Sequence, residues 1–228
     1  MRRSVDDAQR DLRELMGREL TLRFPPQGVL ADTPLRRSAV LILFGALDRT
    51  PAAGGATTVP PELDVLLTRR APRMRHHAGQ IAFPGGGVEP EDRDTAHTAL
   101  REAQEETGLD PSGVEVLGTL PEVHIPVSNN LVTPVVGWWR LPSAVAADHS
   151  ESVEVFRTPV AELLSPPARG TSVLQRVGFS FRAPAFTLDE RFGGHTVWGF
   201  TGVLLATMFD ELGWAEPWDS ERELPVQP

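Results

Sequence analysis

The segment from Asp94 to Leu109 constrains the fold of this chain more than any other part of the sequence. Asp94 is a residue type that caps the start of helices, and Gly108 is the type that ends them, so a helix is expected between the two. Its small and apolar residues fall on one stripe and should pack on a core: Ala96, Ala99, Leu100, Ala103 and Thr107.

Three carboxylates lie on another side of this helix. Glu102, Glu105 and Glu106 stand at i, i+3 and i+4, so the helix places them on one face. Like charges this close repel each other, and in Glu-rich helices a solvated acidic face is the commoner arrangement. A divalent cation would convert the repulsion into a set of ligands. Mg²⁺ and Mn²⁺ prefer such oxygen ligands, so either is the expected cofactor.

The stretch from Gly86 to Leu109 resembles a Nudix box. In that family a glycine-rich loop leads into a helix with the pattern Arg-Glu-apolar-x-Glu-Glu-x-Gly-apolar, and every fixed position of the helical half is matched from Arg101 onward. The loop half departs from the pattern. The family has a glutamate eight residues before the arginine, where this chain has Arg93. The nearest acid is Asp92, which implies one extra residue in the loop.

The segment before the box narrows the resemblance to a subgroup. Residues 66–86 look like the segment that precedes the box in coenzyme A pyrophosphatases, and a longer box loop is also typical of that subgroup. Ala71 replaces the usual serine. Weaker similarities follow at residues 132–137 and 195–202, so the resemblance spans about residues 38–210. The matching positions before the box are Arg70, Arg75, Gly79 and Phe83 to Gly86.

The resemblance implies a metal-dependent site. Glu102, Glu105 and Glu106 are the candidate metal ligands, and the carbonyl of Gly86 is an additional one because a glycine-rich turn lets the backbone approach closely. Arg101 is expected to hold a carboxylate through its guanidinium fork and thereby orient a ligand glutamate.

The same resemblance implies catalytic and substrate-binding residues. The general base is Glu105, acting through metal-bound water, or Glu151 on a later loop, with Glu122 a weaker option. Arg70 and Arg75 are the candidates for binding phosphates, beside the loop glycines Gly85 and Gly86, since an arginine fork pairs with phosphate oxygens. Nearby are His76 and His77, of which at most one should face the site. For four aromatic residues core packing is the more common role, and stacking on an adenine is the alternative: Trp138, Trp139, Phe156 and Trp198.

Composition limits the partners and the compartment. The formal net charge is −9, from 22 basic and 31 acidic residues, whereas nucleic-acid binders carry a basic excess. Local positive charge for an anionic substrate comes from the six basic residues between Arg69 and His77. No apolar run approaches the ~20 residues of a membrane helix, and no signal peptide is expected. Cysteine is absent, which excludes disulfides and zinc-thiolate sites; a reducing cytoplasm fits best.

The periodicity along the chain predicts strands mixed with a few helices. The fold class is therefore α/β, and the resemblance implies a Nudix-type α/β/α sandwich around a mixed β-sheet. We expect an N-terminal helical extension over residues 1–36, the Nudix hydrolase domain over 37–212, and a disordered tail over 213–228. Strands are expected at 39–47, 63–68, 114–120, 130–140, 153–156, 179–188 and 195–197, and further helices at 6–18, 159–164 and 199–212.

As implied by the resemblance, water would attack the diphosphate of coenzyme A or a derivative and give 3′,5′-ADP and 4′-phosphopantetheine. Two alternatives stay open. One is a Nudix enzyme for another nucleoside diphosphate derivative, such as ADP-ribose or a dinucleotide. The sequence reason for this alternative is Ala71, which replaces the usual serine. The other is a catalytically silent Nudix fold that binds a nucleotide or a protein partner. By analogy with the family, a homodimer is expected.

Overall fold

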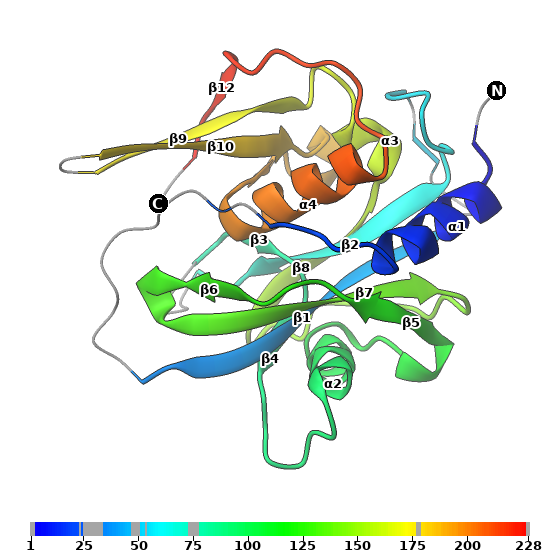
Figure 1. The fold of residues 1–228 in the computed structure, drawn as a ribbon, viewed down its shortest axis with the longest axis vertical. Helices are drawn as coiled ribbons and strands as arrows, with labels where there is room; N and C mark the ends of the chain where they lie inside the picture. Colours follow the sequence, from blue (N-terminus) through cyan, green and yellow to red (C-terminus); the bar gives the residue numbers. More distant parts are fainter. Residues whose placement is uncertain are drawn as a thin grey trace.

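A mixed β-sheet forms the centre of the fold (Figure 1). The computed structural model describes residues 3–22, 24, 34–46, 51–52, 54–72, 78–176 and 179–226. Within these residues the strand order is β3-β2-β1-β7-β5, while β4, β6 and β8 pair with β1, β7 and β2. The strands are β1 (Arg36–Ala46), β2 (Leu63–Arg70), β3 (Ile81–Ala82), β4 (Gly85–Gly87), β5 (Val114–Thr119), β6 (Val123–Ile125), β7 (Asn130–Trp139) and β8 (Ser152–Pro159).

The sheet is mixed because β1 and β7 run parallel, whereas the other pairings are antiparallel. Helix α2 (Thr95–Thr107) covers one face, and α1 (Val5–Met16) and α4 (Gly199–Glu211) pack on the other, as Figure 1 shows. Helices therefore enclose the sheet on both sides, which confirms the predicted α/β class and mixed sheet.

A second sheet lies beyond α4 (Figure 1). Its strand order is β11-β10-β9-β12. Strands β9 and β10 pair with each other, but of these two only β10 was predicted from the sequence. The bounds are β9 (Arg169–Arg176), β10 (Phe179–Thr187), β11 (Thr196–Val197) and β12 (Glu223–Leu224). The remaining elements are α3 (Val160–Leu163) and three 3₁₀ turns, at Pro111–Gly113, Pro126–Ser128 and Glu190–Phe192.

The N-terminal helix was predicted from its alternating pattern, and α1 follows that prediction closely. Ser4 and Asp7 form a capping box, which satisfies backbone N–H groups that the first turn leaves without partners. Ala8, Leu12 and Leu15 are fully buried in the core that α4 also lines. The helix is thus packed on the same core as the central sheet. The division of the chain at residues 36 and 212 stays a prediction.

The prediction of a disordered tail differs from the structure. Trp214 is fully buried, and its indole Nε1 donates to Asp11 at 2.9 Å. Further on, β12 pairs with β9, and the Trp218 ring lies 4.8 Å from the guanidinium of the buried Arg169. Disorder was predicted from the proline-rich, acidic composition of the tail. Composition does not show that single aromatic residues in such a segment can bury large areas.

Replacing Trp214 by alanine is expected to destabilise the protein by about 3–5 kcal/mol, since a fully buried indole leaves a cavity that the core cannot close. Its ring packs against Phe44 and Phe209, at centroid distances of 6.1 and 6.3 Å. Urea denaturation measures the change. Leu141→Ala is the control, because Leu141 is 63% exposed and should change stability by less than about 0.5 kcal/mol. Equal stability of the two variants would contradict the packed tail.

Among the described residues, no helix combines the length and the apolar character that crossing a bilayer requires.

Candidate active site

Helix α2 begins and ends where its capping residues predicted. The Asp94 side chain accepts from the N–H of His97 at 2.7 Å, and Gly108 adopts the left-handed conformation with φ of 69°. Thr98, Ala99, Ala103 and Thr107 are buried, and the two alanines belong to the core cluster that contains β1 residues.

The three glutamates of α2 lie in different surroundings. Glu106 is only 4% exposed, and the Glu102 side chain is 14% exposed. The Glu105 side chain is 59% exposed and accepts from Arg101 at 3.1 Å. The i, i+3, i+4 spacing therefore gives one buried, one half-buried and one outward carboxylate.

Glu106 stands next to other charges. Burial raises the pKa of Glu106 to about 8, and the negative charges of Glu102 and Glu151 add to the rise. The Arg70 guanidinium and a hydrogen bond from the Gly85 backbone act in the opposite direction. Burial also raises the pKa of Glu102, and the negative charge of Glu151 contributes to this rise. Carboxylates from two separate parts of the chain thus converge beside an arginine of β2.

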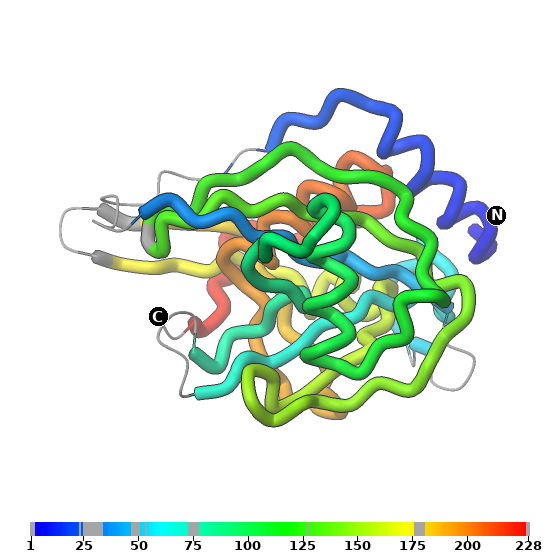
Figure 2. Tube along the Cα trace, turned by 90° about the horizontal axis from the view of Figure 1, so that it is seen from below, coloured from blue at the N-terminus to red at the C-terminus, as the bar shows by residue number. Residues whose placement is uncertain are grey.

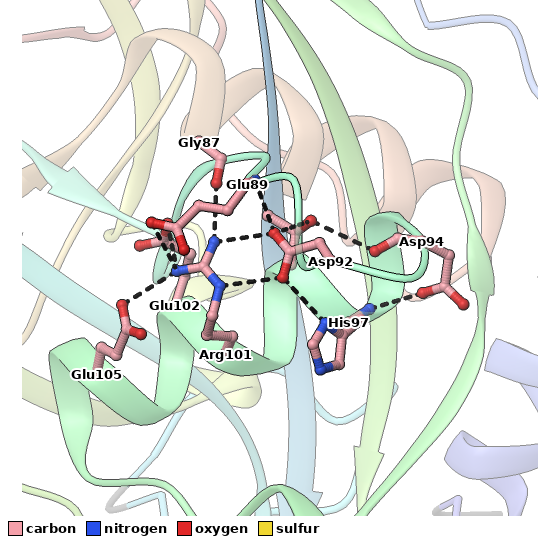
Figure 3. A network of polar contacts seen from close by, with 9 residues as sticks. Gly87, Glu89, Asp92, Asp94, His97, Arg101, Glu102 and Glu105 are labelled. Atoms are coloured by element: carbon pink, nitrogen blue, oxygen red, sulfur yellow. Dashed lines mark hydrogen bonds and ion pairs between the residues drawn. The ribbon is translucent and has the colours of Figure 1, made fainter.

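Arg101 is the centre of a polar network (Figure 3). Its Nε and Nη2 both donate to Asp92, at 3.1 and 3.0 Å, and Nη2 also donates to the Gly87 carbonyl at 2.9 Å. Its Nη1 lies 3.0 Å from Glu102 and 3.1 Å from Glu105. The guanidinium fork therefore connects the loop after β4 to the acidic face of α2.

Asp92, the acid nearest to the expected box position and the least certain member of the predicted site, lies in the loop before α2 and contacts Arg101. Its side chain is 1% exposed and also accepts from the Thr98 hydroxyl and the Glu89 N–H, each at 2.9 Å. Hydrogen bonds from Arg101 hold the pKa of this carboxyl well below its usual range. The signal was present in the sequence as the nearest acid to the expected box position, displaced by one residue.

The glycines of β4 face different neighbours. A Cβ at Gly85, which has φ of 158°, would stand 2.6 Å from the Val40 Cα, so this position requires glycine. A Cβ at Gly86 would overlap the carboxyl group of Glu102. At Gly87 a Cβ would meet nothing within 4 Å. Of these three positions, only Gly86 would place a Cβ against the carboxyl group of a candidate ligand.

Of the other predicted residues, some lie within the described part of the chain and some fall outside it. Arg70 is half-buried at the end of β2, while Arg75, His76 and His77 fall in residues 73–77, outside the described part of the chain. Glu122 is ion-paired with Arg37 at 3.2 Å. Core packing holds for three of the aromatic residues, since Trp138, Trp139 and Phe156 are 6%, 3% and 7% exposed.

The carboxylates of α2 lie in an arrangement that bears on metal binding. Among the residues that the structure describes, no three His, Asp or Glu side chains are grouped so that they could hold an ion as they stand. Glu105 is turned toward Arg101 instead. Mg²⁺, however, is usually bound through one or two carboxylates together with waters and substrate phosphates. Glu102 and Glu106, with the Gly86 backbone against Glu102, are a donor set of that kind.

The chain is similar to a family model, to curated relatives and to solved structures. A family model described as NUDIX domain matches residues 48–172. A relative from Escherichia coli O7:K1 (strain IAI39 / ExPEC), named Uncharacterized Nudix hydrolase NudL, is 37% identical over 153 residues, 67% of this chain and 77% of the relative. The protein of the same name from Yersinia pestis (strain Pestoides F) is 35% identical over 162 residues, 71% and 79% of the two chains. Among solved structures, a Nudix hydrolase from M. smegmatis, RenU, is 26% identical with a TM-score of 0.42, covering 57% of this chain and 78% of the other.

Proposed function

The chain belongs to the Nudix hydrolase family, and we propose that it hydrolyses the diphosphate linkage of coenzyme A or a coenzyme A derivative to 3′,5′-ADP and 4′-phosphopantetheine. The observation that carries the proposal is the convergence of Glu102 and Glu106 with Arg70, which belongs to the segment that resembles coenzyme A pyrophosphatases. Carboxylates for a cation and a guanidinium for a phosphate then meet at one place.

The metal requirement follows from the chemistry of these side chains. Glu102 and Glu106 would hold Mg²⁺ or Mn²⁺, with the Gly86 carbonyl as a further ligand. A bound ion supplies neutralisation of charge on the nonbridging phosphate oxygens and a lower pKa for bound water. Glu105, predicted as a third ligand, would have to leave Arg101 to take that role.

The other residues of the site have distinct tasks in the proposed reaction. Arg101 orients the Glu102 carboxylate, because its fork is held on the opposite side by Asp92. Glu151 accepts the proton of the attacking water, with Glu105 as the alternative base. Arg70 and Arg75 bind the phosphates, and the loop at Gly85 and Gly86 lets the substrate approach the backbone.

A second candidate substrate is another nucleoside diphosphate derivative. Ala71, which replaces the serine of the coenzyme A subgroup, is 1% exposed and follows Arg70 directly. A missing hydroxyl at this position removes one hydrogen-bonding group from the neighbourhood of the phosphate-binding arginine. A homodimer and a cytoplasmic location stay predictions from the sequence.

Incubation of the purified protein with coenzyme A, ADP-ribose or NADH tests the proposal, in separate reactions with Mg²⁺, Mn²⁺ or EDTA. We expect 3′,5′-ADP from coenzyme A only when a divalent ion is present, measured by liquid chromatography. Turnover of ADP-ribose or NADH without turnover of coenzyme A would favour the second candidate. No turnover of any of the three would favour the silent, nucleotide-binding alternative.

A further inference from the structure

The segment between β7 and β8 is hydrogen-bonded directly to α2. It leaves β7 after Trp139, runs past α2, and enters β8 at Ser152, as the view onto α2 shows (Figure 2). The N–H of Ala146 donates to the Thr107 carbonyl at 2.9 Å, and the N–H of Asp148 donates to the Glu106 carbonyl at 3.2 Å. Carbonyls in the last turn of a helix have no partner within the helix, so these two bonds hold the segment against the residue that carries the buried carboxylate.

The side chain of Asp148 closes the turn that carries Glu151. It accepts from the N–H of Ser152 at 3.0 Å and from the N–H of Glu151 at 3.2 Å. The N–H of His149 donates to the Ser152 carbonyl at 2.9 Å. His149 has φ of 62°, a left-handed conformation that residues other than glycine adopt where the surrounding contacts determine it. The turn is therefore closed by two hydrogen bonds to the Asp148 carboxylate and by the backbone bond from His149 to Ser152.

Glu151 is also held from the opposite side. Its carbonyl accepts from the N–H of Ala71 at 2.7 Å, and the next residue, Ser152, pairs with Arg70. The backbone of Glu151 thus lies between the end of β2 and the turn bonded to α2. Its charge acts on both Glu102 and Glu106, which agrees with this placement.

We propose that Asp148 is a positioning residue: its carboxylate, bonded to the Glu151 and Ser152 backbone while its own N–H is bonded to Glu106, sets the place of the Glu151 side chain relative to the α2 glutamates. The inference rests on the proposed function, in which Glu151 acts on the attacking water. Asp148 itself touches no reacting atom. Its effect passes through the turn, because a small displacement of a catalytic group is enough to slow a reaction.

Three single variants test the proposal on the full chain. Asp148→Ala removes both acceptor bonds and is expected to lower kcat by about tenfold with KM changed less than about twofold, because the displaced group acts on the transition state. Asp148→Asn keeps an acceptor oxygen and should restore kcat to within about threefold of wild type. Asp110→Ala is the matched control, since Asp110 accepts from the Ser112 N–H at 2.9 Å in a comparable exposed turn; its kcat should not change.

A double-variant cycle separates positioning from a general structural effect. In the Glu151→Gln background, Asp148→Ala should cause no further loss of kcat, because the group that it positions no longer functions. An equal loss in both backgrounds would overturn the proposal. So would an unchanged kcat in Glu151→Gln, or an Asp148→Asn variant as slow as Asp148→Ala.

Two readouts do not need a substrate. Hydrogen exchange should become faster at the Glu151 and Ser152 amides in Asp148→Ala and stay unchanged elsewhere, whereas Asp110→Ala should leave that segment unchanged. Calorimetric titration with Mn²⁺ should give a weaker affinity for Asp148→Ala than for Asp110→Ala, because a displaced Glu151 takes negative charge away from Glu102 and Glu106. If the wild type hydrolyses no diphosphate, the proposed function fails, and the positioning role is then decided by these measurements. Unchanged exchange and unchanged Mn²⁺ affinity would overturn it.

Discussion

Replacing Glu106 by glutamine is expected to lower kcat for diphosphate hydrolysis by about a hundredfold to a thousandfold while the protein stays folded. Glutamine has the shape of glutamate, and its amide oxygen can still accept the hydrogen bond from the Gly85 backbone. What it loses is the negative charge that would bind a divalent ion.

The same substitution should not reduce stability. Burial disfavours the charged form of Glu106 and raises its pKa to about 8, so a neutral side chain at this position removes a group that is costly to bury. We therefore expect the free energy of unfolding to stay equal or to rise, measured by urea denaturation at pH 8.5, where the carboxyl is mostly charged. Calorimetry should show weaker binding of Mn²⁺.

Glu105→Gln is the matched control on the same helix, because the Glu105 side chain is 59% exposed and bonded to Arg101. Its loss of kcat should be much smaller than that of Glu106→Gln. If Glu106→Gln retained wild-type activity, the metal site would have to lie elsewhere. If Glu105→Gln caused the larger loss, Glu105 would be the ligand or base that the sequence pattern predicted, and it would have to turn away from Arg101 to act.

The three consecutive glycines of β4 should give three different results when each is replaced by alanine. Gly86→Ala is expected to lower kcat by about a hundredfold, because the new Cβ would occupy the place of the Glu102 carboxyl group. The displaced group is the end of a flexible side chain, so the fold can adapt and stability should change little. We therefore expect Gly86→Ala to lower activity while leaving stability nearly unchanged.

The neighbouring positions are the controls for this effect. Gly85→Ala should destabilise the fold, since Gly85 has φ of 158° and the new Cβ would stand 2.6 Å from the Val40 Cα. Gly87→Ala should leave both kcat and the thermal midpoint near wild type, because its Cβ would meet nothing within 4 Å. Wild-type activity in Gly86→Ala would show that the position of the Glu102 carboxylate is not critical.

Most of the secondary structure followed from short-range patterns. The limits of α2 were predicted from Asp94 and Gly108, and the buried strand β1 from a continuous apolar run. The errors occurred where the signal was weak or depended on distant partners. Strands β3, β4 and β12 have two or three residues each and exist because they pair with β2, β1 and β9. A periodicity cannot be recognised in so few residues.

In the candidate site, too, local patterns predicted some features and contacts between distant segments determined the others. The spacing of Glu102, Glu105 and Glu106 indicated a common helix face, yet their exposures differ because the loop after β4 and the turn at Glu151 approach only part of that face. Asp92 was recognised as the nearest acid to the expected position. Its contact with Arg101 became visible only in the folded loop.

By itself, the sequence determined the helix, its caps, the acidic triplet and the resemblance to the Nudix family, because these features depend on residues within a few turns of one another. Only the tertiary structure decided which carboxylate is buried, which carboxylates Arg101 contacts, and that Asp148 connects Glu151 to Glu106. Burial and charge at each of these groups come from chain segments tens of residues apart, and no local pattern records how those segments meet.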